Sequence, residues 1–487
     1  MAACARRAAT GGLGPASKKG LSLPVATPCA TSVRNHIRRP RPRIHSPYSR
    51  SPALPSSRWR VPAAAQVRQS RASWADALTA YVTPFIQMND FSGTILILRE
   101  GRDSVVAGFG LADRARGIAN GLATRFGIGS LTKTFTAAAI AILDERGALS
   151  LDDTLGKYIP RFPHGGEITI RHLLAHTSGV PDYHSLPDYR ARRARPTTLS
   201  DFAGWIGTKP LDFRPGAKDA YSSSGYALLA YVIERVSGLK YGEFLRRNLF
   251  EPLGMTETGE LKDSGSVPGL ATGYDPGFPP AGVQAPPRMS ATWLEGSGSL
   301  YSTTADLLRW ARAIRDDRLF QLEALDYPYG WGKRIWLGRE VIEQDGRIAL
   351  GYASHISIYP KDSVIVVILG NIQSAVTDRM RTDLAALAFG EPYQLPELRR
   401  GANPRPALLQ QYTGRYQVGP GFVMTVRAEG THLSVAGPEG DFLPLDPESD
   451  STFFFRVLYV PVRFERDTAG AVVDLNWGGQ LVCEKIQ

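Results

Sequence analysis

The stretch RFGIGSLTKTFTAAAIAIL, from Arg125 to Leu143, decides how the rest of the chain is interpreted. Gly127 and Gly129 form a flexible approach to Ser130, and the residues from there on are apolar on nearly every side. This pattern predicts a buried helix that begins at or just before Ser130. The free amides and the positive end of the helix dipole would then lie beside the serine, where they stabilise an oxyanion.

Lys133 lies one helical turn after Ser130, so we expect its amine within hydrogen-bonding reach of the serine hydroxyl. Burial in an apolar helix disfavours the charged amine and would let Lys133 take the serine proton. The pattern Ser-x-x-Lys also fits a helix cap followed by a surface lysine, and it is too short to separate the two interpretations. Ser237 and Lys240 repeat it, but Ser237 ends a helical run and faces the wrong end of the dipole.

Three stretches in this order resemble the serine beta-lactamase-like superfamily. They are RFGIGSLTKTFTAAAI, ITIRHLLAHTSGVPDY (Ile168–Tyr183) and YSSSGYALLAYVIERVSG (Tyr221–Gly238). The superfamily includes class C beta-lactamases, penicillin-binding proteins, D-aminopeptidases, family VIII-type esterases and a mitochondrial filament-forming relative. The resemblance implies an α+β fold with an antiparallel sheet flanked by helices, a helical subdomain beside the sheet, and acyl-enzyme chemistry at Ser130.

The resemblance also assigns roles in the second motif of the family, Tyr-x-Asn. Tyr221 matches its tyrosine, whose phenol moves protons at the leaving group. The other interpretation of Tyr221 is a core tyrosine that opens a helix. Ser223 stands where the family has asparagine, so it keeps a hydroxyl but loses the amide that contacts a substrate carbonyl.

The third motif, usually Lys-Thr-Gly or His-x-Gly on the edge strand, is identified as Gln344, Asp345 and Gly346. Arg347 follows and would supply the second oxyanion amide from its backbone. Penicillins carry a carboxylate that a cationic third motif recognises, and Gln344 has no charge. A site of this kind favours an ester or amide over a beta-lactam. The expected substrate-binding residues are Ser223, Gln344, Gly346 and Arg347.

We therefore expect a metal-independent serine hydrolase in which Ser130, Lys133 and Tyr221 are catalytic. Its substrate would be a small ester, amide or peptide, with ester hydrolysis the first choice and hydrolysis of D-amino-acid peptides or amides the next. The alternative is a catalytically weak or inactive scaffold or binding protein of the same fold, suggested by Ser223 and Gln344. The oligomeric state does not follow from the sequence.

No cofactor and no metal ion are expected. His172 and His176 are spaced to share a helix face, but no glutamate completes a metalloprotease motif, and the stretch matches the structural HTSG segment of the family. His355, on an alternating strand, is expected to be structural. The chain has 3 cysteines, placed so that they build neither a disulfide framework nor a metal site.

The positive charge of the chain is confined to its N-terminal end. Residues 1–75 contain 14 of the 57 Lys and Arg residues and none of the 46 Asp and Glu residues, which leaves 43 basic against 46 acidic residues in the rest. We therefore expect no nucleic-acid partner. Residues 1–74 are rich in Arg, Ser and Pro and are predicted to be a disordered basic extension.

Two locations fit this extension. Its composition resembles an organellar transit peptide, which would place the protein in mitochondria, although a mis-assigned start codon would produce a similar segment. In a bacterium, PAAAQ at 62–66 could be the remnant of a cleavage site in a periplasmic or secreted protein. No apolar run reaches the roughly 18 residues of a transmembrane helix, so none is expected.

The remaining sequence divides into three parts. Residues 75–390 are the predicted hydrolase domain, in which helical spacing, a strand hairpin and a buried helix are followed by helices and then by further strands. Residues 391–406 form a polar, proline-bearing linker. Residues 407–487 contain short alternating strands, which predict a small all-β barrel similar to the lipocalin-like domain of several relatives.

Overall fold

The computed structural model describes residues 66–67, 73–263, 266–278, 281–318, 330–399, 401–419, 422–438, 440–479 and 481–486. The chain divides into two compact units, Met1–His45 and Ser46–Gln487, and all described residues belong to the second unit. Among these described residues, no helix is both long enough and apolar enough to cross a membrane.

The extension predicted to be disordered lies mostly outside the described residues. Its described part differs from the prediction, because Gln66–Val67 form strand β1, which pairs with β15 (Tyr393–Gln394). Ser73 then caps helix α1 (Trp74–Gln87) by accepting a hydrogen bond from the Asp76 amide at 3.2 Å. Strand pairing and helix capping satisfy backbone hydrogen-bonding groups, and neither can be recognised from amino-acid composition alone.

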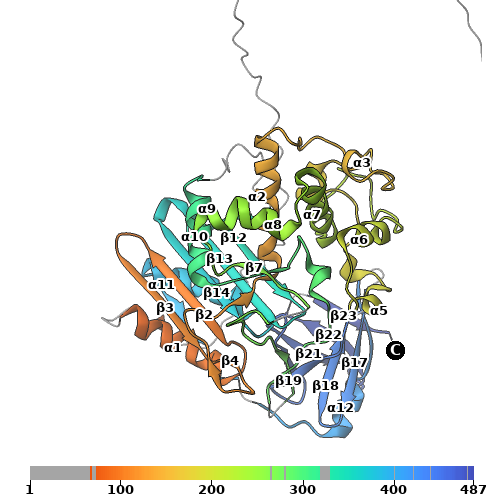
Figure 1. The fold of residues 1–487 in the computed structure, drawn as a ribbon. Helices are drawn as coiled ribbons and strands as arrows, with labels where there is room; N and C mark the ends of the chain where they lie inside the picture. The colour runs from red at the N-terminus through yellow and green to blue at the C-terminus, as the bar shows by residue number, and fades with distance from the viewer. Residues whose placement is uncertain are drawn as a thin grey trace, which may run out of the picture. The chain divides into compact units, whose positions relative to one another are not determined.

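A six-stranded antiparallel sheet forms the centre of the fold, in the order β11-β12-β13-β14-β2-β3 (Figure 1). Its strands are β2 (Gly93–Arg99), β3 (Asp103–Phe109), β11 (Gly332–Trp336), β12 (Arg339–Ile348), β13 (Tyr352–Tyr359) and β14 (Val364–Gly370). The predicted hairpin is β2 and β3, and strand β14 is apolar and buried along its whole length. The antiparallel sheet is confirmed.

Helices cover both faces of this sheet, because its central strands are apolar on both sides. In β2, Ile95 and Ile97 belong to the core under α1 and α11 (Val376–Phe389), whereas Leu96 belongs to the core that includes α2. Alternate residues of a strand point to opposite faces, so one strand supplies both cores. Helix α10 (Thr304–Arg315) contributes to the α2 side, and Thr303 caps it.

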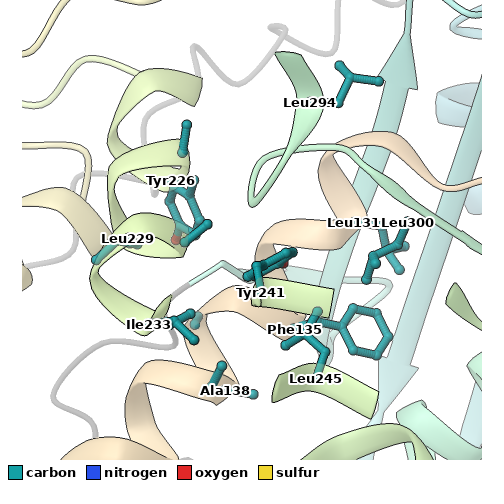
Figure 2. Packing of buried hydrophobic residues seen from close by; sticks show 14 of the residues in the cluster. Leu131, Phe135, Ala138, Tyr226, Leu229, Ile233, Tyr241, Leu245, Leu294 and Leu300 are labelled. Carbon is teal, nitrogen blue, oxygen red and sulfur yellow. The ribbon is translucent and has the colours of Figure 1, made fainter. Parts of the chain in front are cut away.

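The predicted buried helix is α2 (Thr132–Glu145), in which every residue from Thr132 to Leu143 is buried. Figure 2 shows Phe135 and Ala138 of α2 beside side chains of α7 and α8. The helices of this region, which confirm the predicted helical subdomain, are α3 (Leu155–Tyr158), α4 (Ile170–Leu174), α5 (Tyr189–Arg192), α6 (Leu199–Ile206), α7 (Ser223–Ser237), α8 (Tyr241–Leu245) and α9 (Glu251–Leu253).

Short strands connect these parts in small sheets, in the orders β4-β5, β6-β10-β7 and β8-β9. They are β4 (Leu111–Asp113), β5 (Ile118–Ala119), β6 (Phe126–Gly127), β7 (Gly259–Glu260), β8 (Asp275–Pro276), β9 (Val283–Gln284) and β10 (Leu300–Ser302). Strand β6 leads directly into the residues around Ser130. Strand β10 pairs with β6 and so holds β6 in place.

The C-terminal segment forms a closed antiparallel barrel, as predicted. It consists of β16 (Gly414–Gly419), β17 (Phe422–Glu429), β18 (His432–Ala436), β19 (Leu443–Pro447), β20 (Thr452–Phe455), β21 (Val460–Arg466), β22 (Val472–Trp477) and β23 (Leu481–Lys485). Helix α12 (Pro406–Tyr412) packs its Leu409 and Tyr412 into the barrel core. The exact limits of the domains and linker remain predictions.

Candidate active site

Ser130 lies at the start of α2, as expected. It belongs to a single 3-10 turn, Gly129–Leu131, that leads into the helix at Thr132. Gly129 has φ +53°, and a Cβ atom added to it would lie 2.9 Å from the backbone nitrogen of Arg347. Only glycine therefore fits at this position, and the turn can approach β12 closely.

Lys133 is almost completely buried, with 1% of its surface exposed. Its Nζ donates hydrogen bonds to Ser130 Oγ at 3.1 Å and to the backbone carbonyl oxygen of Ser297 at 2.8 Å. The same Nζ lies 5.0 Å from the ring centroid of Tyr221 and 5.6 Å from that of Tyr226. These contacts fix the amine next to the serine and rule out the alternative of a surface lysine.

Tyr221 lies just before α7, and its phenol oxygen is 2.8 Å from Ser130 Oγ. Its side chain is 47% exposed, so the alternative of a core tyrosine is wrong. The ring of His176 packs against it at a centroid distance of 4.7 Å. Ser130, Lys133 and Tyr221 thus meet, although 91 residues separate the serine from the tyrosine.

His176 positions the segment that carries Tyr221. Its Nδ1 accepts a hydrogen bond from the Ser222 amide at 3.1 Å, and its carbonyl oxygen accepts one from the Ala220 amide at 2.9 Å. Burial, together with the nearby charge of Lys133, lowers the pKa of His176 to about 3. The imidazole is therefore neutral near pH 7, and its Nδ1 can accept the hydrogen bond from the Ser222 amide.

Ser223, the first residue of α7, is buried. Within the described part of the chain, its hydroxyl forms no hydrogen bond to Ser130, Lys133 or Tyr221. The structure places it two positions after the phenol but outside the hydrogen-bonded group. Its substrate-binding role remains a prediction.

Strand β12 brings the third motif to the serine. A Cβ atom on Gly346 would lie 2.9 Å from the Ser130 nitrogen and 2.1 Å from the Ile128 carbonyl oxygen. The backbone amides of Ser130 and Arg347 therefore lie on two segments in close contact, as an oxyanion hole built from these two amides would need. The pairing of β11 with β12 ends at Glu343, so Gln344 begins the part of β12 that β11 leaves unpaired.

Charged side chains lie next to Gln344. The sequence predicted no role for these side chains. The Arg347 guanidinium donates a hydrogen bond to Asp378 of α11 at 3.0 Å and lies 3.8 Å from the Asp345 carboxylate. Despite burial, the two carboxylates and the Tyr221 phenol raise the pKa of Arg347. The third motif therefore has a neutral side chain at Gln344 and charged side chains beside it, at Asp345 and Arg347.

Sequence reasoning missed the Ser297 carbonyl. The sequence feature that marks this loop is the pair of glycines on either side of Ser297. Gly296 has φ +77°, and a Cβ atom there would lie 2.5 Å from the Tyr226 carbonyl oxygen. Glycine lets this loop approach the helices closely and turn a carbonyl towards Lys133.

The repeated Ser-x-x-Lys pattern does not form a second site. Ser237 donates its hydroxyl proton to the Ile233 carbonyl at 2.6 Å, and Lys240 is 86% exposed beside Glu234. His172 forms a capping box with Thr169 at the start of α4. Over the described ranges, no group of three or more His, Cys, Asp or Glu residues is arranged to hold a metal ion.

Known proteins match most of the chain. A family model described as Beta-lactamase matches residues 78–390. Penicillin-binding protein 4* of Bacillus subtilis (strain 168) is 30% identical over 416 residues, which cover 78% of this chain and 91% of that protein. A teichoic acid D-alanine hydrolase of Staphylococcus aureus is 28% identical and covers 60% of this chain and 73% of its own length.

Solved structures agree with the fold. A penicillin-binding protein from Bacillus halodurans has a TM-score of 0.55 and 30% identity, and the match covers 62% of this chain and 98% of that chain. An octameric penicillin-binding protein homologue from Pyrococcus abyssi has a TM-score of 0.57 and 22% identity, with 85% of this chain and 100% of that chain covered. The second similarity supports the fold alone.

Proposed function

The chain belongs to the beta-lactamase family, and from this premise we propose that it is a serine hydrolase that cleaves a carboxylic ester or amide through an acyl-enzyme at Ser130. One observation carries the proposal. Ser130 Oγ lies within hydrogen-bonding distance of both Lys133 Nζ, at 3.1 Å, and Tyr221 Oη, at 2.8 Å. A nucleophile between two proton carriers is equipped for covalent catalysis.

In the acylation step, Ser130 Oγ attacks the substrate carbonyl carbon and its proton passes to Lys133. Tyr221 delivers a proton to the departing alcohol or amine, so the leaving group leaves neutral and the acyl group stays on Ser130. Between these events the proton would pass from Lys133 to Tyr221, whose ring centroid lies 5.0 Å from the lysine Nζ. In deacylation, water attacks the acyl-enzyme, releases the carboxylic acid and returns the proton to Ser130.

The negative charge of the tetrahedral intermediate develops on the former carbonyl oxygen. The backbone amides of Ser130 and Arg347 are the proposed donors to it, because the segments that carry them are in contact. Removing one such donor in other hydrolases costs about 10²–10³-fold in kcat. Neither backbone donor can be deleted by an ordinary substitution, so the test of this proposal rests on the nucleophile.

The test is intact-mass spectrometry of the purified chain after incubation with a fluorophosphonate. We expect a single adduct on Ser130, no adduct in Ser130→Ala, and retained thermal stability in that variant. Ester turnover that persists in Ser130→Ala would overturn the proposal. As a control, Ser237→Ala should label normally, because Ser237 is bonded within its own helix.

A parallel incubation with a penicillin separates the substrate classes. A fluorophosphonate adduct without a penicilloyl adduct would support an esterase or amidase, whereas both adducts would indicate a site that also recognises lactams. If no adduct forms with either reagent, the alternative of an inactive scaffold is favoured, and size-exclusion chromatography should then show defined assemblies.

A further inference from the structure

The loop at residues 296–300, which we call the carbonyl loop, is bonded to helix α2 through two of its backbone carbonyls. Thr136 Oγ1 donates a hydrogen bond to the Gly296 carbonyl oxygen at 2.6 Å, and Lys133 Nζ donates one to the Ser297 carbonyl oxygen at 2.8 Å. The two side chains are three positions apart, so they lie on one face of the helix. The proposed base and a neighbouring threonine therefore hold consecutive residues of one loop.

The Thr136 hydroxyl also lies 2.6 Å from the phenol oxygen of Tyr241 in α8. A carbonyl oxygen can only accept, so Thr136 gives its single proton to Gly296 and accepts the proton of Tyr241. Burial raises the pKa of Tyr241, which keeps that proton on the phenol. The Thr132 carbonyl oxygen is a more distant acceptor for Thr136, at 3.4 Å. The hydrogen bonds therefore run from Tyr241 through Thr136 to the carbonyl loop, and both side chains are fully buried.

Other hydrogen bonds of the carbonyl loop do not fix its first residues against α2. At the far end of the loop, the Leu300 amide donates to Thr132 Oγ1 at 3.1 Å. Within the turn, the Gly298 amide donates to the Leu294 carbonyl oxygen at 2.7 Å, which preserves the shape of the turn but not its distance from the helix. Apart from the lysine itself, Thr136 is the α2 side chain that holds the start of the loop.

The position of the carbonyl loop matters because Lys133 divides its hydrogen bonds between the loop and the nucleophile. Its Nζ lies 2.8 Å from the Ser297 carbonyl oxygen and 3.1 Å from Ser130 Oγ. A lysine side chain is a flexible stem, so the acceptors around the amine determine where it points. The carbonyls of Gly296 and Ser297 belong to consecutive planar peptide units, so a shift of one moves the other. A loop released by Thr136 would therefore draw the amine away from Ser130.

Resting on the proposed hydrolase function, we propose that Thr136 and Tyr241 are positioning residues for the transfer of the Ser130 proton to Lys133. Both are fully buried, so they act through the carbonyl loop and not on the substrate. The loop holds the amine at hydrogen-bonding distance from the nucleophile. The amine can then accept the proton of Ser130 while Oγ forms its bond to the substrate carbonyl carbon.

The test follows the phosphonylation of Ser130 by a fluorophosphonate over time, with the full chain and intact-mass detection. In this reaction an Oγ–P bond forms, the P–F bond breaks, and fluoride leaves without a proton, so the only proton to be removed is that of Ser130. Thr136→Val removes the hydroxyl and keeps a branched side chain of similar size. We expect the limiting rate at saturating reagent to fall by about 10- to 100-fold, while the half-saturating concentration changes less than about twofold.

Two further variants grade the effect. Thr136→Ser keeps the hydroxyl and should retain the wild-type limiting rate to within about threefold. Tyr241→Phe removes the donor to Thr136, whose hydroxyl can then turn towards the Thr132 carbonyl. This variant should lower the limiting rate by about two- to fivefold, because the bond to the carbonyl loop is weakened but not abolished.

The matched control is Thr94→Val. Thr94 is a buried residue of β2, and its hydroxyl donates to another loop carbonyl, that of Gly121, at 3.4 Å. The control should keep the limiting rate, because this loop does not contact Lys133.

A wild-type limiting rate in Thr136→Val, or an equal loss in Thr136→Ser, would overturn the inference while the hydrolase function stands. An equal loss in Thr94→Val would also overturn it, because the effect would then follow from the removal of any buried hydroxyl. If Thr136→Val does not fold, Tyr241→Phe decides, and an unchanged rate in that variant overturns the inference. No adduct on wild-type Ser130 would overturn the inference and the proposed function together.

Discussion

At the scale of single residues, Tyr221 gives the sharpest prediction about the chemistry. Its phenol lies 2.8 Å from Ser130 Oγ, where it can hand a proton to the leaving group. Tyr221→Phe should lower kcat/KM by about 10²-fold. The loss should be larger for an anilide than for a phenyl ester of the same acid, because an amine must be protonated to leave whereas a phenol need not. Steady-state kinetics with the two substrates measures this difference.

Tyr231 provides the control for this substitution. It lies on α7, the helix that follows Tyr221, is half-buried, and has no hydrogen bond from its phenol among the described contacts. Tyr231→Phe should leave both rates unchanged. An anilide-to-ester ratio that is the same in Tyr221→Phe and in the wild type would contradict the role of the phenol at the leaving group.

Residues of the site differ in how far the sequence could predict them. Ser130 and Lys133 are three positions apart, in the 3-10 turn and in the first turn of α2 that follows it, so local spacing places them together. Tyr221 is distant in sequence and was identified only by its resemblance to a known motif. The Ser297 carbonyl, 164 residues from Lys133, could not be predicted, because Gly296 and Gly298 indicate a tight turn but not the side chain that its backbone oxygen contacts. The same holds for the Asp378 partner of Arg347, which a separate helix supplies.

At the scale of secondary-structure elements, the contact between the turn before α2 and strand β12 controls the position of Ser130. Gly346→Ala would place a Cβ atom 2.1 Å from the Ile128 carbonyl oxygen, and backbone cannot move aside cheaply. We expect kcat/KM to fall by about 10²-fold, since a displacement of about 1 Å is sufficient for that. Ester kinetics and circular dichroism, measured together, separate this loss from unfolding.

Gly204→Ala is the control for a glycine substitution. Gly204 lies in α6, and an added Cβ atom there would meet nothing within 4 Å. Alanine in a helix is more favourable than glycine by about 0.5–1 kcal/mol, so this variant should be slightly more stable and fully active. Full activity in Gly346→Ala would show that the two segments are not as tightly coupled as their contact implies.

Three carboxylates from different elements approach one another near the start of α8. They belong to Glu234 in α7, Glu260 in β7 and Glu295, which follows the turn at Ala291–Leu294. Burial, and then repulsion by Glu260, raises the pKa of Glu295 to about 8. Burial raises the pKa of Glu260 to about 7. Both groups therefore favour their neutral forms in the native state.

This cluster predicts how stability depends on pH. The native state binds more protons than the unfolded state between the ordinary carboxyl pKa, about 4.3, and these raised values. The raised pKa values of Glu260 and Glu295 therefore stabilise the native state below that range, and this stabilisation is lost as the pH rises through it. Glu295→Gln should therefore raise the free energy of unfolding at pH 8.5 by about 1–2 kcal/mol, and with it the melting temperature. At pH 4 the substitution should have little effect.

Calorimetry at the two pH values tests this, with Glu145→Gln as the control. Glu145 is the last residue of α2, is exposed, and has no ion pair with any described residue. Its substitution should change stability little at either pH. A melting temperature of Glu295→Gln that is lower than that of the wild type at pH 8.5 would contradict the raised pKa.

Elements with strong local patterns were predictable. The apolar run of β14 and the buried α2 are fixed by their own residues, whichever neighbours they pack against. The pairing of β1 with β15 was not predictable, because its two strands are only 2 residues long and lie far apart in the chain. Such short segments carry no periodicity from which a strand can be recognised.

At the scale of the whole described molecule, the barrel is tied to the catalytic part by polar contacts that no sequence pattern indicates. Asp441 accepts hydrogen bonds from Arg190 and Arg193, each at 2.6 Å. Arg399 of the predicted linker pairs with Asp90, which is fully buried, at 2.6 Å. These contacts join segments about 250 to 300 residues apart, so their partners could be found only in the folded chain.

Arg456 is the most buried of the barrel residues that make such contacts, with 3% of its surface exposed. Its guanidinium donates to the carbonyl oxygens of Gly277 and Gly282, in the hairpin of β8 and β9, and pairs with Asp446 at 2.6 Å. Arg456→Ala would leave two carbonyls and one carboxylate without this partner. Breaking a buried ion pair from one side costs about 3–5 kcal/mol, so we expect a melting temperature several degrees lower.

The same substitution decides whether the barrel and the catalytic part unfold as one unit. We expect the wild type to unfold in a single calorimetric transition. If Arg456 is a main link between the two parts, its loss should split that transition into two, because each part has its own apolar core. Arg463→Ala is the control, since Arg463 is exposed on the same barrel and has no ion pair with a described residue. A single, lowered transition in Arg456→Ala would instead mean that Asp441 and Arg399 are sufficient to keep the two parts cooperative.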